Sequence, residues 1–283
     1  TLGVDVDIFE AKDKPSGLTV FGTAPYKITN EAALKEVKYL QDQLKFNIHY
    51  NSPVAPDDLK SLEKEYDAIF IGVGIGPTAE TNIPGEDKEG VVGAVEFIEE
   101  LRMKHHKVDV PDRVVVIGGG NTAIDAASET ARMGAEKVRL LYRRKKEDKG
   151  GYDFEYEYAL KAGVEGVFNV QPLEILGDDK VEGIKVIKTK EKNEALEYID
   201  GSEYEIPCDM VIRATGQAKV LNLLNAVEEL ELDEKDRIKV DNETFQTGNP
   251  KYYAGGDAIN GGAEVVNGAY DGKMAAKAMV ENF

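Results

Sequence analysis

The stretch that decides the fold reads Val114-Val115-Val116-Ile117-Gly118-Gly119-Gly120-Asn121-Thr122-Ala123. An apolar run of strand type leads into the pattern Gly-x-Gly-x-x-Ala, and a helical pattern follows over 121–133. In a dinucleotide-binding βαβ unit the first glycine permits a tight turn, and the second lets the backbone approach a pyrophosphate. The small third residue lets the helix pack on the strand, and the helix N-terminus attracts the anion. We therefore predict a cofactor-binding turn that contains Gly118, Gly120, Asn121, Thr122 and Ala123.

The next strand of this unit is expected at 137–142, and it ends in an arginine pair. Arg143 and Arg144 lie about 22 residues beyond Gly120. At this position of a βαβ unit a carboxylate binds the free ribose hydroxyls, whereas an arginine accommodates a 2′-phosphate. Two guanidiniums favour NADPH over NADH, because they match phosphate geometry. The alternative is an exposed basic patch that continues into Lys145 and Lys146.

Composition restricts the class of protein. The chain has 283 residues, 42% of them hydrophobic, with a net charge of −18 and a pI of about 4.7. Such a charge repels nucleic acid and anionic lipid, so we expect neither as a partner. An apolar run of ~20 residues is needed to span a bilayer. The longest run, around 68–75, has the length of a strand, so we expect no membrane association.

Cysteine usage restricts the redox chemistry. Cys208 is the one cysteine in the sequence, so the chain cannot form an intrachain disulfide, a C-x-x-C pair or a four-cysteine cluster. Any iron–sulfur centre must lie elsewhere. The three histidines show no metal-ligand spacing, and we predict no metal site. The cysteine count fits a reducing compartment and no signal peptide is visible, so we expect a cytoplasmic protein. The sequence starts at Thr1 without a methionine, which leaves targeting open.

Strand patterns alternate with amphipathic helix patterns along most of the chain, which predicts parallel α/β sheets. Strands are expected at 4–9, 46–50, 67–73, 113–117, 137–142, 210–214 and 252–254. Helices are expected at 30–44, 91–103, 121–133, 154–161 and 263–280. Between them, residues 166–209 show short alternating strands with polar turns, which predicts an inserted antiparallel β meander.

The first expected strand, 4–9, ends in Glu10. A carboxylate there is typical of a site for an unphosphorylated ribose, as in FAD, although glutamates at strand ends are common. The glycine turn that should precede such a strand is not in the sequence. Either the chain is truncated or its upstream part was not included, and a domain without this turn would lack its pyrophosphate cradle.

Motifs in a familiar order carry a family resemblance. They are Ile71-Gly72-Val73-Gly74, the segment from Gly118 to Asp125, Tyr142-Arg143-Arg144 and Ala254-Gly255-Gly256-Asp257-Ala258. Over nearly its whole length the chain resembles the flavin subunit of NADPH-dependent glutamate synthase and its relatives. These relatives include the flavin portion of dihydropyrimidine dehydrogenase. The segment Phe21-Gly22-Thr23-Ala24-Pro25-Tyr26-Lys27-Ile28 looks most like the flavin subunits of bacterial dihydropyrimidine dehydrogenases.

The resemblance implies a fold and an activity. The fold is α/β with two dinucleotide-binding, Rossmann-like domains: an NAD(P) domain at 110–217 inserted in an FAD domain at 1–109 and 218–283. The activity is hydride transfer between NAD(P)H and FAD, with NADP(H) favoured over NAD(H). Electrons are exchanged with an iron–sulfur centre on a partner domain or catalytic subunit. No side chain is nominated as an acid, base or nucleophile.

The resemblance also implies which residues contact FAD. Glu10 would bind the adenosine ribose, Val54 the adenine, and Gly72 and Gly74 would pass close to the phosphates. The flavin itself would be contacted by Gly17 and Leu18, with Lys27 nearby, and by a helix that begins at Ala263-Glu264-Val265. A helix N-terminus stabilises the negative charge of reduced flavin. The set is completed by Gly256, by Asp257 at the ribityl chain or pyrophosphate, and by Gly216 of the Thr215-Gly216-Gln217 motif.

The sequence departs from this family in several places, and rivals remain. The family often has Met-Pro-Ala after the arginine pair, where this chain has Lys149-Gly150-Gly151, so the contact of that loop with cofactor is in doubt. The cysteine-rich iron–sulfur region and the first FAD glycine turn are not in the sequence. Cys208 replaces an alanine of the family, which favours a packed residue. One rival is a disulfide reductase of the thioredoxin-reductase type, which needs a paired thiol. The other is a flavin-free structural or assembly subunit that retains the nucleotide-binding fold.

Overall fold

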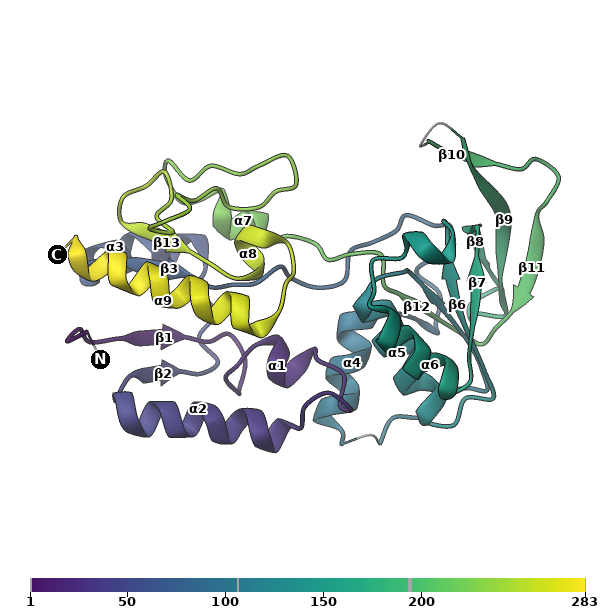
Figure 1. Cartoon of the computed structure of the whole chain (residues 1–283), viewed down its shortest axis with the longest axis horizontal. Helices are drawn as coiled ribbons and strands as arrows, with labels where there is room; N and C mark the ends of the chain where they lie inside the picture. The colour runs from purple at the N-terminus through teal and green to yellow at the C-terminus, as the bar shows by residue number, and fades with distance from the viewer. Residues whose placement is uncertain (1, 106, 193–194, 283) are drawn as a thin grey trace. The chain divides into compact units, whose positions relative to one another are not determined.

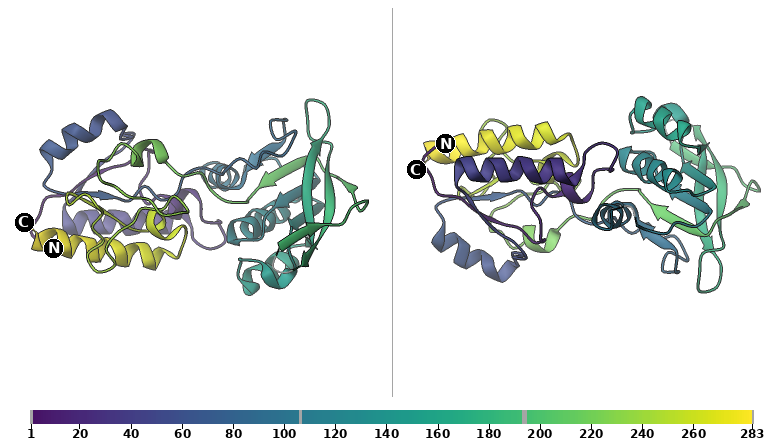
Figure 2. Two further views of the ribbon diagram at one scale, coloured as in Figure 1. Left: turned by 90° about the horizontal axis from the view of Figure 1, so that it is seen from above. Right: turned by 90° about the horizontal axis from the view of Figure 1, so that it is seen from below.

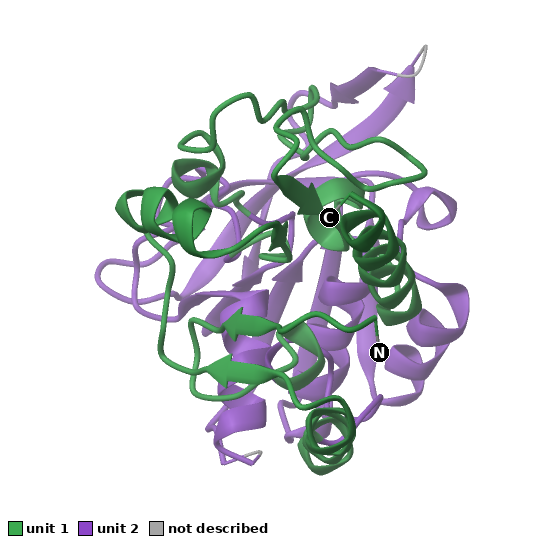
Figure 3. Ribbon diagram, turned by 90° about the vertical axis from the view of Figure 1, so that its left-hand side faces the viewer, with its two compact units in different colours: residues 1–20, 30–76, 218–283 green, residues 21–29, 77–217 purple. Residues whose placement is uncertain are grey.

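The computed structural model describes residues 2–105, 107–192 and 195–282 (Figure 1). The chain divides into two compact units, which Figure 3 distinguishes by colour. The first unit comprises residues 1–20, 30–76 and 218–283, and the second comprises 21–29 and 77–217. The second unit therefore interrupts the first in the sequence.

A parallel sheet runs through the second unit in the order β4-β12-β5-β6-β7. The strands are β4 (Val91–Gly93), β5 (Arg113–Ile117), β6 (Lys137–Tyr142), β7 (Val164–Phe168) and β12 (Met210–Arg213). Both faces of this sheet are covered, so its central strands are almost continuously apolar, as the run Val114–Ile117 shows. Burial of each such side chain contributes roughly 1.5–3 kcal/mol.

Helices cover one face of the parallel sheet, as two further views also show (Figure 2). They are α4 (Ala94–Met103), α5 (Asn121–Arg132) and α6 (Asp153–Lys161). The buried residues Ala123, Ile124, Ala126 and Ala127 of α5 pack with Val114 and with other side chains from the same face of the sheet. Small residues at these positions let α5 approach the sheet closely, which places its first turn directly above the end of β5.

An antiparallel sheet covers the other face, and it confirms the predicted meander from residue 170 onward. Residues 166–168, which were also expected in the meander, instead belong to β7 of the parallel sheet. Its strands are β8 (Val170–Leu176), β9 (Gly183–Lys192), β10 (Ala195–Tyr198) and β11 (Tyr204–Pro207). Strands β8, β10 and β11 all pair antiparallel with β9. Their inward side chains pack with Val115, Ile117 and Val211, and Cys208 lies in the same core. The alternation along β5, with Val114 and Val116 toward the helices and Val115 toward the meander, holds the three layers together.

The first unit contains parallel strand pairs and its own helices. Strand β1 (Asp7–Phe9) pairs with β2 (Asn47–His49), and β3 (Ile69–Ile71) pairs with β13 (Tyr252–Ala254). The helical elements are α1 (Leu18–Phe21), α2 (Asn30–Leu44), η1 (Pro56–Asp58), α3 (Leu59–Glu65), α7 (Leu221–Leu224), α8 (Asp257–Asn260) and α9 (Val265–Glu281). Tyr252 and Tyr253, fully buried neighbours on β13, face opposite cores. Residues from α3, α7 and α8 pack around Tyr252, whereas Tyr253 packs against α9.

One local difference from the sequence-based expectations comes from a distant contact. The expected helix at 91–103 begins only at Ala94, because Val91–Gly93 forms β4 and pairs with β12. This contact joins residues far apart in the sequence, which local patterns do not report. The second compact unit begins its main segment at residue 77, and the expected domain boundary between 109 and 110 stays a prediction.

No helix in the described part of the chain has the length and apolar character needed to cross a membrane.

Candidate functional site

The glycine turn after β5 has the form that a pyrophosphate requires. Gly118 adopts a φ of +151°, and a Cβ on it would lie 2.4 Å from the carbonyl oxygen of Ala214. Gly120 caps the N-terminus of α5, and a Cβ on it would meet no heavy atom of the described chain within 4 Å. Gly118 thus allows close packing against Ala214, the residue after β12, while Gly120 faces open space beside the first turn of a helix. Ala123 is fully buried beneath this turn.

The middle glycine of the turn, Gly119, was not among the predicted site residues. The position nevertheless requires a glycine, because the ring of Tyr142 occupies the space of a side chain. A Cβ on Gly119 would lie 2.5 Å from ring carbons of Tyr142, the last residue of β6. The Tyr142 hydroxyl donates to the carbonyl oxygen of Asp148 at 2.8 Å. The aromatic ring therefore lies on the glycine turn and ties it to the segment that follows β6.

That segment, residues 143–149, is called the basic loop here and contains the short 3₁₀ helix η2 (Lys146–Asp148). Its backbone is fixed by Thr189 Oγ1, which donates to the Arg143 carbonyl at 2.7 Å, and by the Asn169 amide, which donates to the Arg144 carbonyl at 3.0 Å. Neither arginine side chain has a hydrogen bond or ion pair to any described residue, and Arg143 is exposed while Arg144 is half-buried. Lys145, by contrast, pairs with Glu191 at 3.3 Å. Two unpaired guanidiniums on a fixed backbone suit an anionic ligand.

Predicted FAD residues of the first unit gather at the carboxyl end of β3 and β13. These strands are parallel, so Gly72 and Gly74 after β3 share one sheet edge with Gly256 after β13. Gly256 adopts a φ of +66°, and its amide donates to Asp271 at 2.8 Å. Asp257, the first residue of α8, accepts a hydrogen bond from the Ala263 amide at 3.0 Å. This bond fixes the entry to α9 beside the end of β13.

The N-terminus of α9 is open and apolar. Glu264 caps the helix, and its amide donates to Asn267 Oδ1 at 3.1 Å. Val265 and Val266 in the first turn are 68% and 71% exposed. Two exposed isopropyl groups at the positive end of a helix fit a ligand that is apolar in its ring and anionic at its edge, as reduced flavin is. The residues present therefore fit FAD.

The remaining predicted FAD residues of the first unit lie on and near β1. Glu10 directly follows β1, and its carboxylate accepts a hydrogen bond from the Lys12 amide at 2.9 Å. Leu18, beside Gly17, starts α1 and is exposed. Val54 is half-buried against the core around Leu59. The assignment of these residues to FAD contacts stays a prediction.

Lys27 has a defined place in the second unit. It belongs to residues 21–29, called the strap here, and its ammonium lies 2.9 Å from Asp125 on α5 and 2.8 Å from Glu155 on α6. Burial lowers the pKa of Lys27, but the charges and hydrogen bonds of the two carboxylates outweigh it and raise the pKa overall. The Tyr26 hydroxyl donates to Asp125 at 2.5 Å, and burial together with this carboxylate raises the pKa of Tyr26. Sequence patterns do not reveal these partners, and the expected place of Lys27 near the flavin stays a prediction.

The side chain of Arg102 on α4 binds the backbone of the same strap. One nitrogen of its guanidinium donates to the carbonyl oxygens of Thr23 and Ile28, the latter at 3.0 Å. Arg102 itself is buried. The strap is therefore attached to α4, α5 and α6 by polar contacts that are largely removed from water.

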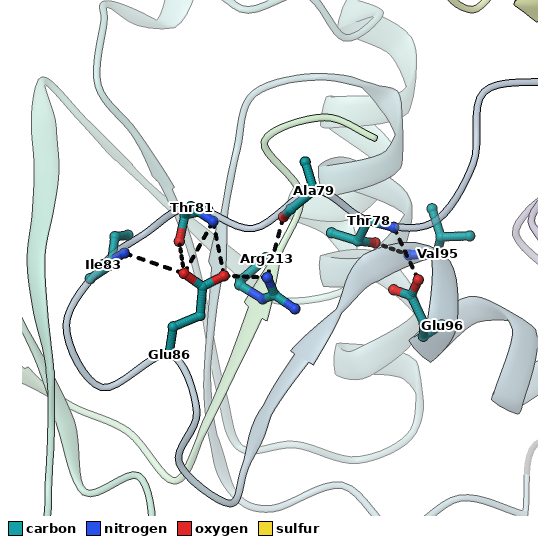
Figure 4. Close-up of polar contacts among 8 residues, drawn as sticks. All are labelled: Thr78, Ala79, Thr81, Ile83, Glu86, Val95, Glu96 and Arg213. Atoms are coloured by element: carbon teal, nitrogen blue, oxygen red, sulfur yellow. Dashed lines mark hydrogen bonds and ion pairs between the residues drawn. The ribbon is translucent and has the colours of Figure 1, made fainter. Parts of the chain in front are cut away.

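A second polar cluster fixes the two segments that leave the second unit, at residues 77–79 and 216–217. Figure 4 shows the part of this cluster that contains Thr78, Ala79 and Arg213. Ala79 donates its amide to the carbonyl of Gly216 at 3.0 Å, and Thr78 bridges to Gln217. Arg213 at the end of β12 donates to the Ala79 carbonyl at 3.2 Å and to the carboxylate of Glu86. The predicted cofactor residue Gly216 thus follows a strand end that is anchored by a half-buried ion pair.

The carboxylate of Glu86 is satisfied by several donors at once. It accepts the amide and hydroxyl of Thr81, both at 2.9 Å, and the amide of Ile83 at 3.3 Å (Figure 4). Burial raises the pKa of Glu86, but these hydrogen bonds and the charge of Arg213 outweigh it and lower the pKa overall. The ionised carboxylate therefore organises the 81–86 turn.

Residues 7–272 match the protein family described as pyridine nucleotide-disulphide oxidoreductase. The chain belongs to this family. Membership confirms the predicted class: an oxidoreductase with an α/β fold that uses FAD and a pyridine nucleotide. It also leaves the family's disulphide chemistry to be tested against the one cysteine of this chain.

Individual relatives confirm the resemblance to glutamate synthase small chains. The glutamate synthase (NADPH) small chain of Escherichia coli (strain K12) is 34% identical over 298 residues, which cover 97% of this chain and 62% of that protein. The NADP(+)-dependent formate dehydrogenase subunit beta of Moorella thermoacetica is 30% identical over 284 residues, covering 97% of this chain and 40% of that protein. The chain thus spans less than two thirds of the length of either relative. The closer likeness to dihydropyrimidine dehydrogenase subunits stays a prediction.

A solved structure supports the fold. Mycobacterium tuberculosis FprA in complex with NADPH has a TM-score of 0.77 to this chain at 21% sequence identity, covering 99% of this chain and 78% of that one. Together with family membership, this likeness confirms the predicted Rossmann-like architecture.

Cys208 of this oxidoreductase is fully buried between the parallel sheet and the meander, as its expected packing role requires. Burial raises the pKa of its thiol to about 12, and the neighbouring Asp209 adds to the rise. A thiolate is the reactive form of cysteine, so this side chain is not suited to disulfide exchange. Among the described residues, no group of three or more His, Cys, Asp or Glu side chains could hold a metal ion.

We predict that replacing Lys27 with methionine destabilises the protein. The side chains of Asp125 and Glu155 are 9% and 8% exposed, and the substitution leaves both without their shared cation. Breaking a buried ion pair typically costs about 3–5 kcal/mol, and Lys27 is itself a quarter exposed, so we expect the lower end. Urea unfolding measures the change. The matched control is Lys35→Met, which breaks an exposed pair with Glu31 on α2 and should leave the midpoint almost unchanged. Equal midpoints for the two variants would contradict the assignment.

We predict that the Cys208 thiol does not react with thiol reagents in the folded protein. Ellman's reagent at pH 8 should release no chromophore until guanidinium is added, and then one equivalent per chain, because the thiol is buried and protonated. The unfolded sample is the internal control. Rapid reaction of one thiol per native chain would show that Cys208 is accessible and would contradict its role as a packed residue.

Proposed function

We propose that this chain is the flavin-dependent, pyridine-nucleotide-oxidising part of an electron-transfer enzyme. It binds NADPH in preference to NADH. It also binds FAD, which is the partner in hydride transfer. Electrons are then exchanged with an iron–sulfur centre on a partner domain or catalytic subunit. The observation that carries the proposal is the pair Arg143 and Arg144, whose side chains meet no described partner while their backbone is fixed beside the glycine turn.

The nucleotide half of the site divides its work between two elements. The amides at the start of α5 and the open face of Gly120 receive the pyrophosphate, because a helix N-terminus favours anions. Arg143 and Arg144 receive the 2′-phosphate, because planar guanidiniums make paired, charge-assisted hydrogen bonds to phosphate oxygens. NADH lacks that phosphate and therefore lacks this interaction.

The flavin half of the site supplies position and electrostatics. Glu10 binds the ribose, Asp257 the ribityl or pyrophosphate region, and the first turn of α9 faces the ring edge that becomes anionic on reduction. When bound, FAD supplies the conversion between a two-electron hydride and single electrons. No side chain of this chain is required as an acid, base or nucleophile.

The partner is inferred from the relatives and from the chemistry that this chain lacks. The two relatives are named as a small chain and a subunit beta, which are parts of larger assemblies. The single cysteine of this chain is buried and protonated, so single electrons must leave to a centre outside these residues. A partner with an iron–sulfur centre fits that requirement.

We predict that the double variant Arg143→Ala and Arg144→Ala binds NADP⁺ about 10- to 100-fold more weakly, a loss of about 1.4–2.8 kcal/mol in total, which is the range of one charged hydrogen bond. Affinity for NAD⁺ should stay nearly the same, because NAD⁺ has no 2′-phosphate. Isothermal titration calorimetry measures both. The control is Lys190→Ala, which removes a positive charge from β9 and should change neither affinity. If the double variant lost affinity for both nucleotides equally, the arginines would act as a basic patch that does not recognise the 2′-phosphate.

We predict that the natively purified protein, with whatever co-purifies, shows a visible flavin band. Anaerobic NADPH should bleach this band faster than NADH does, because hydride transfer requires a bound nucleotide. Dithionite, which reduces free and bound flavin alike, serves as the control. A flavin-free preparation, or a band that neither nucleotide bleaches, would favour a structural subunit that retains only the fold.

A further inference from the structure

Residues 150–152 join the basic loop to α6, and they lie directly on the glycine turn. The amide of Gly151 donates to the carbonyl oxygen of Gly119 at 2.9 Å. The next amide, that of Tyr152, donates to Asn121 Oδ1 at 2.8 Å. Two consecutive amides of this connection therefore bond to the two residues that flank Gly120.

The fit at Gly151 leaves no room for a side chain. A Cβ there would lie 2.3 Å from Ile124 Cδ1, 3.1 Å from the carbonyl carbon of Gly120 and 3.2 Å from Asn121 Oδ1. Ile124 is fully buried in the helix-side core, so its methyl group cannot easily move aside. At Gly150, one residue earlier, an added Cβ would have no described heavy atom within 4 Å. The close contact thus belongs to Gly151 and not to its neighbour.

The other end of the basic loop is attached to the same turn. The ring of Tyr142 lies on Gly119, and its hydroxyl holds the Asp148 carbonyl at 2.8 Å. Gly119 therefore contacts the residue before the loop and accepts a hydrogen bond from Gly151 after it. The loop that carries Arg143 and Arg144 is closed onto the turn proposed to receive the pyrophosphate.

We propose that Gly151 and Asn121 are positioning residues for recognition of the 2′-phosphate. They clasp the basic loop onto the glycine turn and so fix the spacing between the guanidiniums and the pyrophosphate site. The ligand class is adenine dinucleotides with a phosphate on the ribose 2′-oxygen, and the inference rests on the proposed preference for NADPH. A loop already ordered before binding avoids the entropy cost of ordering it with the ligand. Loosening this clasp, the contacts of Gly151 and Asn121, should therefore weaken the binding of NADP(H) more than that of NAD(H).

The test compares Gly151→Ala with its matched control Gly150→Ala in the full chain. Calorimetry gives the dissociation constants of NADP⁺ and NAD⁺ for each protein. We expect Gly151→Ala to lower the ratio of NAD⁺ to NADP⁺ dissociation constants by about 5-fold or more. Gly150→Ala should keep the wild-type ratio. A general loss of stability would weaken the binding of both nucleotides and leave the ratio unchanged. The ratio therefore distinguishes a positioning role from an effect on folding.

A second variant and a second readout cover the case in which Gly151→Ala does not fold. Asn121→Ala removes the acceptor of the Tyr152 amide without adding volume, and it should lower the same ratio. Trypsin cleaves after arginine and lysine, so it also reports on the basic loop without any nucleotide. We expect cleavage within 143–149 to be faster in both clasp variants than in wild type or Gly150→Ala.

The outcomes distinguish this inference from the proposed function. A wild-type ratio near one would overturn the NADPH preference, and the clasp would lose its role with it. A wild-type preference for NADP⁺ that survives in both clasp variants would overturn the clasp alone. A reduced ratio with faster cleavage in the clasp variants, and neither change in Gly150→Ala, would support it.

Discussion

Close backbone packing around the glycine turn is the constraint on which the rest of the second unit depends. A Cβ on Gly118 would meet the residue that follows β12, and one on Gly119 would meet the last residue of β6. The turn can lie at the end of the parallel sheet only because both positions lack side chains. Gly120 differs, because the space beside it is open. Two glycines of the motif therefore serve the fold and one faces open space, where the proposed ligand would lie, although sequence alone presents them as one pattern.

Helix α5 carries both the proposed anion site and the attachment of the strap. Its N-terminus begins at the glycine turn, and one turn later Asp125 accepts bonds from Tyr26 and Lys27. Burying carboxylates on α5 and α6 is costly, and the cation of the strap offsets this cost only when it is in place. Glu155 keeps one buried oxygen without a partner in the described chain, so the cluster is not arranged for maximal stability. Its effect is to specify where residues 21–29 lie, because any other position would leave buried charges unpaired.

The sequence predicted those features that rest on local patterns and missed those set by distant neighbours. Residues 113–117 and 137–142 were predicted as strands because buried parallel strands are continuously apolar. Strand β4 was missed because its three residues continue into a helical pattern and pair with β12 more than a hundred residues later. Gly118, Gly120 and the arginine pair follow from the spacing of the βαβ unit. Gly151 does not, because its reason lies in the Cδ1 of Ile124 and the backbone of Gly120.

The charge distribution of this protein makes Arg143 and Arg144 a local positive site on an acidic protein. The chain carries a net charge of −18, which repels phosphates over most of its surface. Within and beside the basic loop, Lys145 pairs with Glu191 and Lys149 pairs with Asp153, so much of the local positive charge is neutralised by the chain itself. Arg143 and Arg144 keep theirs available beside the one open glycine of the turn. The phosphorylated dinucleotide proposed as ligand would therefore be attracted to a defined point and not to the surface at large. In that proposal, selectivity follows from the placement of two charges against an acidic background.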